Sequence, residues 1–340
     1  MLQLPQVLAS YQIGEVTEVG PAGGTAGKCW RVTTGAGRYF LRCRGPRTSS
    51  PKAMEFDHGL RRHLLARGVP TAVPIPTRSG ETWVGVNGRA FELYPFIEGR
   101  RFGGSLTELT ETALALAGFH QAAAGYPARG SYSPSPAQFA IAASAVGGSD
   151  RLDDIELILA AFEQIASGEP AMRYAVEQAG RLVEAYSAAA YQALPRWLIH
   201  GDYHPGNLLY ADSGKVAGIF DLDWACEHTR SRDLADAVYF FAAPRSGPLD
   251  DSRIESLTDA AEPDLDRARL FLQAYRQVSP VTPVEAHAIP LALAARWLAM
   301  RLEGSAKVPA DRRVWFITRD LERPLQWLAL HAEELVGSVL

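Results

Sequence analysis

The first 95 residues carry short apolar runs separated by turn residues, a pattern typical of a β-rich region. One helix interrupts the runs, because apolar positions recur at helical spacing through residues 51–67 and Gly68 follows as a C-terminal stop. The last two runs enclose Asn87-Gly88, the favoured two-residue turn of a hairpin. The predicted strands cover residues 13–19, 29–33, 38–43, 82–86 and 89–94.

Helical periodicity dominates the rest of the chain. Ser105 and Glu108 have the spacing of a capping box and predict the start of a helix that ends near His120. Residues 125–150 are rich in Gly, Pro, Ser and Ala, which indicates a loop or insertion. Further helices are predicted within residues 151–193, 233–241, 291–302 and 315–340, and short strands at residues 197–199, 208–210 and 216–220. The whole pattern indicates an α+β fold.

The loops beside these three short strands hold an ordered set of acidic and amide side chains. Asp202 precedes Asn207 by five residues, and Asp221 follows the last strand. Phosphoryl transfer from ATP needs a carboxylate to orient and deprotonate a hydroxyl, together with a carboxylate and an amide oxygen to hold Mg2+. A hairpin of the second and third strands would bring Asn207 and Asp221 to one end and close a metal site.

Two other interpretations of these residues stay open from the residues alone. Asp and Asn are common in turns and at helix caps, so each of the three has a structural explanation by itself. His200 and His204, together with the nearby aspartates, have the ligand types of a transition-metal hydrolase. The hydrolase interpretation leaves Asn207 and the β-rich first region unexplained, so phosphoryl transfer is favoured.

The segments 198–209, 218–224 and 232–235 resemble the superfamily that contains aminoglycoside phosphotransferases, choline kinases and type II homoserine kinases. A His-Gly-Asp sequence ends at Asp202 where protein kinases have His-Arg-Asp, and an Asp-Leu-Asp sequence replaces Asp-Phe-Gly. The resemblance implies a two-lobed, protein-kinase-like fold. Residues 1–95 would form a nucleotide-binding lobe, and residues 96–340 a mainly helical lobe for catalysis and substrate binding.

This resemblance implies roles for the ordered residues of the second lobe. Asp202 would be the catalytic base, and Asn207 and Asp221 would bind Mg2+. Asp233, at the start of a predicted helix, is expected to cap that helix or to hold the catalytic loop through hydrogen bonds.

The resemblance also implies nucleotide-binding residues in the first lobe. Period-two geometry places Phe40 and Arg42 on one face of their strand, with Phe40 at the adenine position and Arg42 in place of the usual phosphate-contacting Lys. Glu55 on the following helix is expected to hold Arg42. The remaining expected nucleotide contacts are Gly23, Gly24 and Thr25 in a glycine-rich loop, and the backbone groups of Glu92 and Tyr94 beside adenine.

The predicted function is an ATP-dependent phosphotransferase whose acceptor is a hydroxyl of a small molecule. The acceptor classes that the resemblance implies are amino sugars such as aminoglycosides, homoserine, and amino alcohols. An amine acceptor would favour acidic residues near the site, and Asp223 and Glu227 are the candidates. A protein Ser/Thr kinase of the same superfamily is one alternative, and a nucleotide-binding regulator with little turnover is another.

Composition and hydropathy narrow the classes of partner that we expect this protein to bind. The net charge of −4 gives no support for nucleic-acid binding. The three cysteines form no CxxC pair, which fits a reducing cytoplasm. No run approaches the roughly 18 apolar residues of a membrane span, and the first residues lack a basic segment followed by an apolar run. We therefore expect a cytoplasmic enzyme that binds no membrane, and the sequence gives no indication of its oligomeric state.

Overall fold

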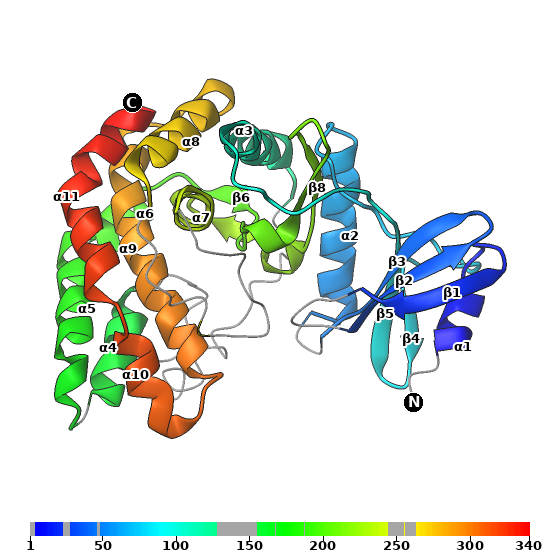
Figure 1. Ribbon diagram of the computed structural model, residues 1–340, viewed down its shortest axis with the longest axis horizontal. Coiled ribbons are helices and arrows are strands. Elements are labelled where there is room, and N and C mark those ends of the chain that lie inside the picture. Colours follow the sequence, from blue (N-terminus) through cyan, green and yellow to red (C-terminus); the bar gives the residue numbers. More distant parts are fainter. Residues whose placement is uncertain are drawn as a thin grey trace.

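The computed structural model describes residues 4–22, 28–45, 48–127, 155–166, 168–186, 188–243, 255 and 263–340. It has a β-sheet region at the N-terminal end and a mainly helical region beyond it, as the sequence predicts (Figure 1). No helix among the described residues is both long and apolar enough to cross a membrane.

The N-terminal sheet has five antiparallel strands in the order β1-β2-β3-β5-β4. A short helix, α1 (Leu4–Ala9), precedes it and was not predicted. The strands are β1 (Val16–Pro21), β2 (Lys28–Thr34), β3 (Gly37–Cys43), β4 (Val84–Val86) and β5 (Arg89–Pro95). Asn87 and Gly88 form the predicted turn between β4 and β5, both at positive φ.

Strand β3 has the two faces that its alternation predicts. Leu41 and Cys43 are buried in the small core of the sheet, with Val32 and Leu93. Phe40 and Arg42 lie on the opposite face and stay half-buried. Arg44, just beyond the strand, continues that second face and is buried.

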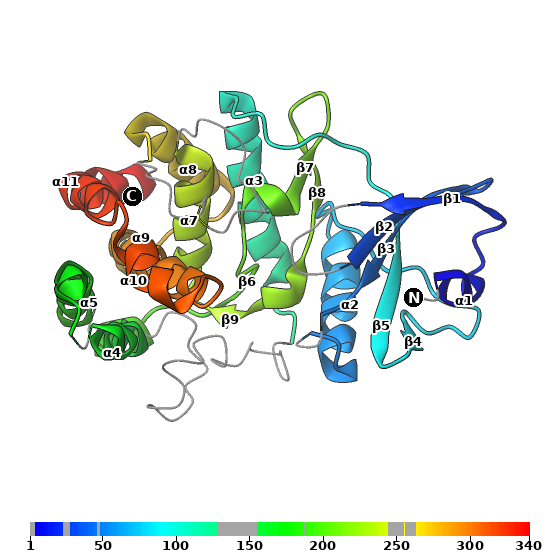
Figure 2. The same cartoon turned by 60° about the horizontal axis from the view of Figure 1, so that its bottom comes forward.

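Helix α2 (Pro51–Leu65) packs against the second region rather than against the core of the sheet. Its first turn is capped by the Ser50 side chain, and Pro51 occupies the first helical position, where its missing N–H costs nothing. Leu60 and Leu64 belong to the large apolar core of the helical region. Figures 1 and 2 both place α2 between the N-terminal sheet and α3 (Leu106–Ala123).

The helical region surrounds two small antiparallel sheets. The capping box that begins α3 is present as predicted. Strand β6 (Trp197–Ile199) pairs with β9 (Cys226–His228), which was not predicted, and β7 (Leu208–Tyr210) pairs with β8 (Val216–Ile219). The other helices are α4 (Ile155–Ile165), α5 (Arg173–Ala185), α6 (Ala188–Gln192), α7 (Ser231–Ala237), α8 (Leu265–Val278), α9 (Pro283–Ser305), α10 (Arg313–Thr318) and α11 (Glu322–Val339).

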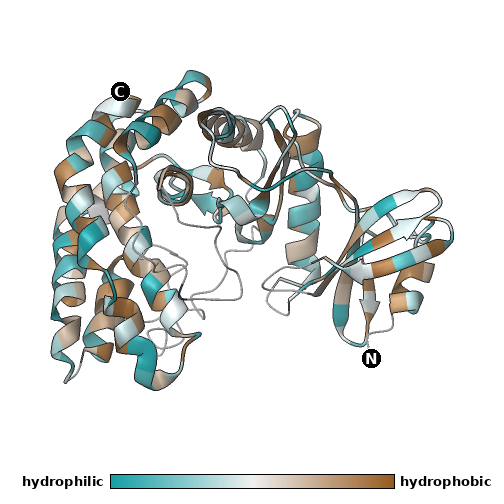
Figure 3. Ribbon diagram, viewed as in Figure 1, coloured by the Kyte–Doolittle hydropathy of each residue, from teal (hydrophilic) through white to brown (hydrophobic). Residues whose placement is uncertain are grey.

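Three predicted helices differ from the structure in extent. Within the described residues of the span 151–193 lie three α-helices, α4 to α6. The span 315–340 is divided between α10 and α11 by Asp320, at positive φ. The helix predicted at residues 291–302 begins earlier, at Pro283, under a second capping box. Most of the predicted loop 125–150 lies outside the described residues. Figure 3 shows the mixed hydropathy of the outer helices α5 and α11, whose apolar positions join the large core.

A buried ionic network ties α2 and β5 to the end of β3. The Arg44 guanidinium donates to Glu92 at 2.5 Å and to Asp57, and Asp57 also accepts from Arg61 at 2.7 Å. The side chains of Arg44, Asp57 and Glu92 are each at most 2% exposed. Buried charges are tolerated only when they are paired, so each member depends on the others.

Replacing Arg44 with Met should strongly destabilise the protein, because Asp57 and Glu92 would lose a shared cation in a buried site. We expect the free energy of unfolding to fall by about 3–5 kcal/mol. Arg38→Met is the matched control, since Arg38 and Glu98 form an exposed pair and such pairs contribute about 1 kcal/mol or less. Urea unfolding of both variants measures the difference, and equal small losses would show that the network is dispensable.

Candidate active site

The β7–β8 hairpin brings the predicted metal ligands together. Leu208 pairs with Ile219, so Asn207 and Phe220 face each other at the open end, where the Phe220 N–H donates to the Asn207 carbonyl at 2.9 Å. Asp221 follows directly. The expectation that a hairpin places Asn207 and Asp221 at one end is met by this backbone geometry.

The side chain of Asn207 is tied to the predicted base. Its amide nitrogen donates to the Asp202 carbonyl at 2.9 Å and to the Asp202 carboxylate at 3.2 Å. An amide held through its nitrogen directs its oxygen the other way. The oxygens of Asn207 and Asp221 are the hard donors that Mg2+ prefers, so the donor set fits this ion.

Asp233 holds the backbone at the start of residues 200–207, the candidate catalytic segment. Its carboxylate accepts hydrogen bonds from the N–H groups of His200, at 2.7 Å, and Gly201, at 2.8 Å, and contacts His120 Nε2 at 3.1 Å. Gly201 has φ +78°, and a Cβ there would lie 2.3 Å from the Trp224 carbonyl oxygen, so only glycine fits. The predicted loop-holding role of Asp233 is therefore present in the hydrogen bonding.

Arg42 reaches from the N-terminal sheet to the acidic residues after β8. Its guanidinium contacts Asp221 at 3.2 Å and both Asp223 oxygens, at 3.0 and 2.6 Å. Asp221 has φ +56°, a left-handed conformation that is uncommon outside glycine and that turns the chain at this point. Arg42 therefore lies next to the candidate metal ligands, where a triphosphate would also have to bind.

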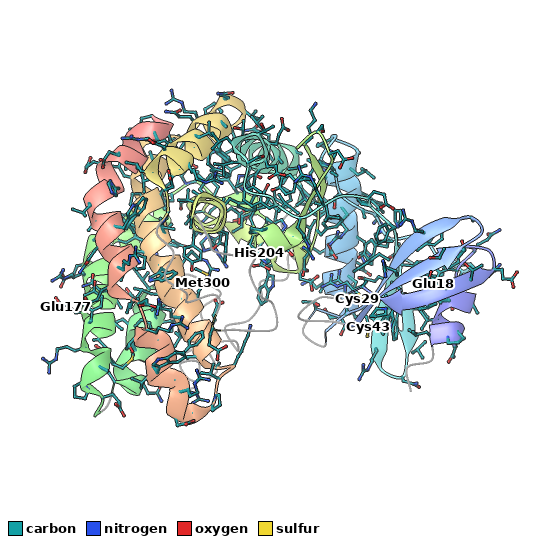
Figure 4. The ribbon with its side chains drawn as sticks, viewed as in Figure 1. Glu18, Cys29, Cys43, Glu177, His204 and Met300 are labelled. Atoms are coloured by element: carbon teal, nitrogen blue, oxygen red, sulfur yellow. The ribbon has the colours of Figure 1, made fainter. Side chains whose placement is uncertain are left out.

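The electrostatic surroundings keep Asp202 ionised. Burial raises the pKa of Asp202, but His204, with further help from His200 and Arg296, more than offsets burial, so the pKa lies well below its ordinary value. His204 Nε2 is 3.5 Å from the Asp202 carboxylate. Burial lowers the pKa of His204, while Asp202 and then Asp236 raise it to a net value above normal. In Figure 4 the His204 side chain projects from the catalytic segment, between the parts of the chain that carry Met300 and Cys29.

The expected pairing of Glu55 with Arg42 is wrong. Glu55 is exposed on α2, and the Arg42 guanidinium contacts Asp221 and Asp223 instead. The acidic residue of α2 that reaches β3 is Asp57, whose partner is Arg44. Helical rotation separates positions 55 and 57 by about 200°, so only one of them faces the sheet. The signal for Arg44 was its place two residues after Arg42, on the same face.

The expected adenine contacts of Glu92 and Tyr94 are also corrected. The Leu93 carbonyl accepts from Ile75, so the neighbouring backbone groups of Glu92 and Tyr94 face β3, opposite Arg42 and Phe40. Their side chains are buried, and the Tyr94 hydroxyl donates to Glu92 at 2.9 Å. Both residues support the ionic network instead of presenting backbone groups to a base.

The two residues predicted to bind an acceptor amine, Asp223 and Glu227, lie in different surroundings. Both Asp223 oxygens are taken by arginines, since Arg44 also contacts this carboxylate, at 3.0 Å; Asp223 is therefore not available to an acceptor amine. Glu227 is exposed on β9, opposite Leu198. Phe40 shares the face of Arg42, as expected. Gly23, Gly24 and Thr25 lie outside the described residues.

Replacing His204 with Gln should move the acid limb of activity to higher pH. The pKa of Asp202 is low because His204 outweighs the effect of burial, so removal of His204 lets burial raise that pKa. A base with a higher pKa loses its ionised form at a higher pH. The kcat/KM profile between about pH 4.5 and 8 checks this, with His331→Gln, a replacement on α11, as control. The wild-type limb falls below this range, because the pKa of Asp202 lies well below its ordinary value. A variant profile that is equally flat would exclude His204 as the controlling group.

Comparisons with known proteins agree with this geometry. A homoserine kinase of Caulobacter sp. (strain K31) is 26% identical over 344 residues, which cover 98% of this chain and 95% of the relative. A homoserine kinase of Parvibaculum lavamentivorans is 28% identical over 304 residues, covering 88% and 83%.

Solved structures share the fold at lower identity. An amicoumacin kinase, solved with AMP-PNP, Ca2+ and Ami, superposes with a TM-score of 0.65 at 15% identity, covering 95% of this chain and 92% of that one. A microcompartment-associated aminopropanol kinase gives 0.64 at 16% identity, covering 98% and 97%. These likenesses establish a protein-kinase-like fold. The family model described as the phosphotransferase enzyme family matches residues 18–271, and the chain belongs to that family.

Proposed function

We propose that this protein transfers the γ-phosphate of ATP to the hydroxyl of a small amine-bearing molecule, with homoserine as the first candidate. Membership of the phosphotransferase family supports the transfer to a hydroxyl. The relatives named above, matched along most of their length, are homoserine kinases, which is the reason for choosing this acceptor.

The observation that carries the proposal is the hydrogen bonding of Asp202 with Asn207, next to Asp221 at the end of the hairpin. Asp202 is ionised at neutral pH, so it can accept the proton of the acceptor hydroxyl. Asn207 and Asp221 would hold Mg2+, and this ion, when bound, would neutralise phosphate charge. A regulator without turnover would not need this complete set.

The N-terminal sheet would bind the nucleotide, with residues 1–95 as its lobe. Arg42 supplies a guanidinium, which suits bidentate contact with phosphate oxygens. In the present arrangement this guanidinium neutralises Asp221 and Asp223. Phe40, half-buried on the same face of β3, would contact adenine. The Pro95 carbonyl faces away from β3, as the alternation of β5 requires, and is the backbone acceptor we assign to the base.

Replacing Asp202 with Asn should leave ATP binding intact and lower kcat by about 10²–10⁴-fold, because an amide cannot accept the proton. Coupled-enzyme assays with homoserine as acceptor measure kcat, and calorimetry measures ATP binding. Asp212→Asn, in the β7–β8 turn, is the matched control and should behave as wild type. Turnover close to wild type in Asp202→Asn would remove Asp202 from the mechanism.

Replacing Asp221 with Ala should weaken the binding of ATP in the presence of Mg2+ more than its binding without metal. The change removes a charged oxygen donor of the ion but also releases Arg42 from a carboxylate. An Arg42 freed from Asp221 should strengthen the binding of metal-free ATP, whereas the loss of the oxygen donor should weaken the binding of ATP with Mg2+. Calorimetry with Mg2+ and with a chelator separates them, and an equal loss in both conditions would assign Asp221 a structural role.

A further inference from the structure

A buried ion pair between α7 and α9 lies beside the candidate catalytic segment. Asp236 of α7 accepts a hydrogen bond from Arg296 Nε of α9 at 2.8 Å. Asp236 is 1% exposed and Arg296 is 5% exposed. Figures 1 and 2 both place α7 and α9 in the helical region, away from β3, which carries the nucleotide-side Arg42.

This pair is close to the residues that would perform the chemistry. Asp236 follows Asp233 by one helical turn, and Asp233 holds the backbone of the catalytic segment. Burial raises the pKa of Asp202, and Arg296 adds to the effect of His204 and His200, which lower it. Asp236 helps to raise the pKa of His204. The His204 ring also lies 5.6 Å from the ring of Phe240, one turn beyond Asp236. The pair is therefore near the place where an acceptor hydroxyl must meet Asp202.

One oxygen of this pair is unsatisfied. Asp236 Oδ2 is buried and has no hydrogen-bond partner within the part of the chain that the structure describes. A buried polar atom without a partner costs free energy, and a buried carboxylate costs more than a neutral group. Burial raises the pKa of Asp236 to about 6, although Arg296 and Arg232 act in the opposite direction. An ammonium group from a ligand would supply the missing donor and stabilise the ionised form.

The guanidinium of Arg296, beside Asp236, suits a negatively charged group of the ligand. Arg296 is anchored to Asp236 through Nε, and its Nη1 lies 3.7 Å from Glu303 Oε1, so two carboxylates fix the plane of the guanidinium and a ligand carboxylate would have to share it with them. A planar guanidinium binds a carboxylate with parallel N–H donors, and its orientation then sets the orientation of the ligand. An acid and a base held together in this way complement a molecule that carries an ammonium and a carboxylate on neighbouring atoms.

We propose that Asp236 and Arg296 recognise the charged end of the acceptor, with Asp236 Oδ2 accepting from its ammonium group and Arg296 donating to its carboxylate. This inference rests on the proposed function, because it places the acceptor hydroxyl at Asp202. It adds two specificity residues from α7 and α9 and requires the acceptor to be a hydroxylated α-amino acid. Amino alcohols without a carboxylate would bind through Asp236 alone.

The test compares three acceptors that differ by one charged group. Homoserine carries both groups, 3-amino-1-propanol lacks the carboxylate, and 4-hydroxybutyrate lacks the ammonium group. We expect kcat/KM of the wild type to fall by about 100-fold or more when either group is absent, since a site built around a polar group rejects analogues that lack it. A wild type indifferent to both groups would overturn the inference without any variant.

Two substitutions then assign each group to its partner. Asp236→Asn should lower kcat/KM for homoserine and for 3-amino-1-propanol by about 100-fold and leave 4-hydroxybutyrate nearly unchanged. Arg296→Met should lower it for homoserine and for 4-hydroxybutyrate and leave 3-amino-1-propanol nearly unchanged. Glu285→Gln is the matched control, because Glu285 pairs with Arg230 in another buried site at 2.7 Å. It should change no acceptor preference.

The outcomes separate this inference from the proposed function. Equal losses on all three acceptors in both variants would make the pair a structural contact and overturn the inference, while homoserine turnover would keep the proposed function. Failure of the wild type to phosphorylate any of the three, with ATP still bound, would overturn both the acceptor and its recognition. If Arg296→Met does not fold, Arg296→Lys, which keeps the charge but not the planar donors, should lose only part of the carboxylate preference.

Discussion

The carboxylate of Asp223 joins the two regions of the molecule, because two arginines from one face of the N-terminal sheet share it. Arg42 contacts both of its oxygens, and Arg44 contacts one of them. Arg44 also contacts Asp57 on α2 and Glu92 on β5. Through this single network the position of the sheet relative to the catalytic hairpin is linked to α2, and the candidate metal ligand Asp221 lies at its edge.

Nucleotide binding would change the partners of Arg42 in this network. Arg42 pairs with Asp221 and Asp223. A nucleotide with its metal would offer this arginine phosphate oxygens and offer Asp221 a cation, so the two charges exchange partners without leaving a buried charge uncompensated. Arg44, which is fully buried and held on three sides, is suited to keep Asp223 in place during that exchange.

The catalytic segment depends on a different kind of contact, made mainly to its backbone. Asp233 accepts from two successive N–H groups, and Asn207 donates to Asp202, the proposed base, which follows these groups in the chain. Since Asp233 and Asp236 lie one turn apart on α7, the helix that holds the candidate catalytic segment also carries Asp236, one of the two residues to which we assign acceptor recognition. The distance between Asp202 and the bound acceptor is then set by a rigid element, as precise positioning requires.

The sequence by itself predicted most of the elements and a candidate catalytic set. The alternation of β3 predicted the face of Phe40 and Arg42, and the Asn-Gly turn predicted the β4–β5 hairpin. The spacing of Asp202, Asn207 and Asp221 indicated the candidate site. These signals are local, so the sequence alone carries them. The partners of the buried charges are contacts between distant segments, so only the tertiary structure decided them. It placed Asp57, rather than Glu55, in contact with an arginine of the sheet, and it paired Asp223 with Arg42 and Arg44. It also turned the backbone of Glu92 and Tyr94 toward β3. It also brought Asp236 and Arg296, 60 residues apart, to one place beside the catalytic segment, which no local pattern can specify.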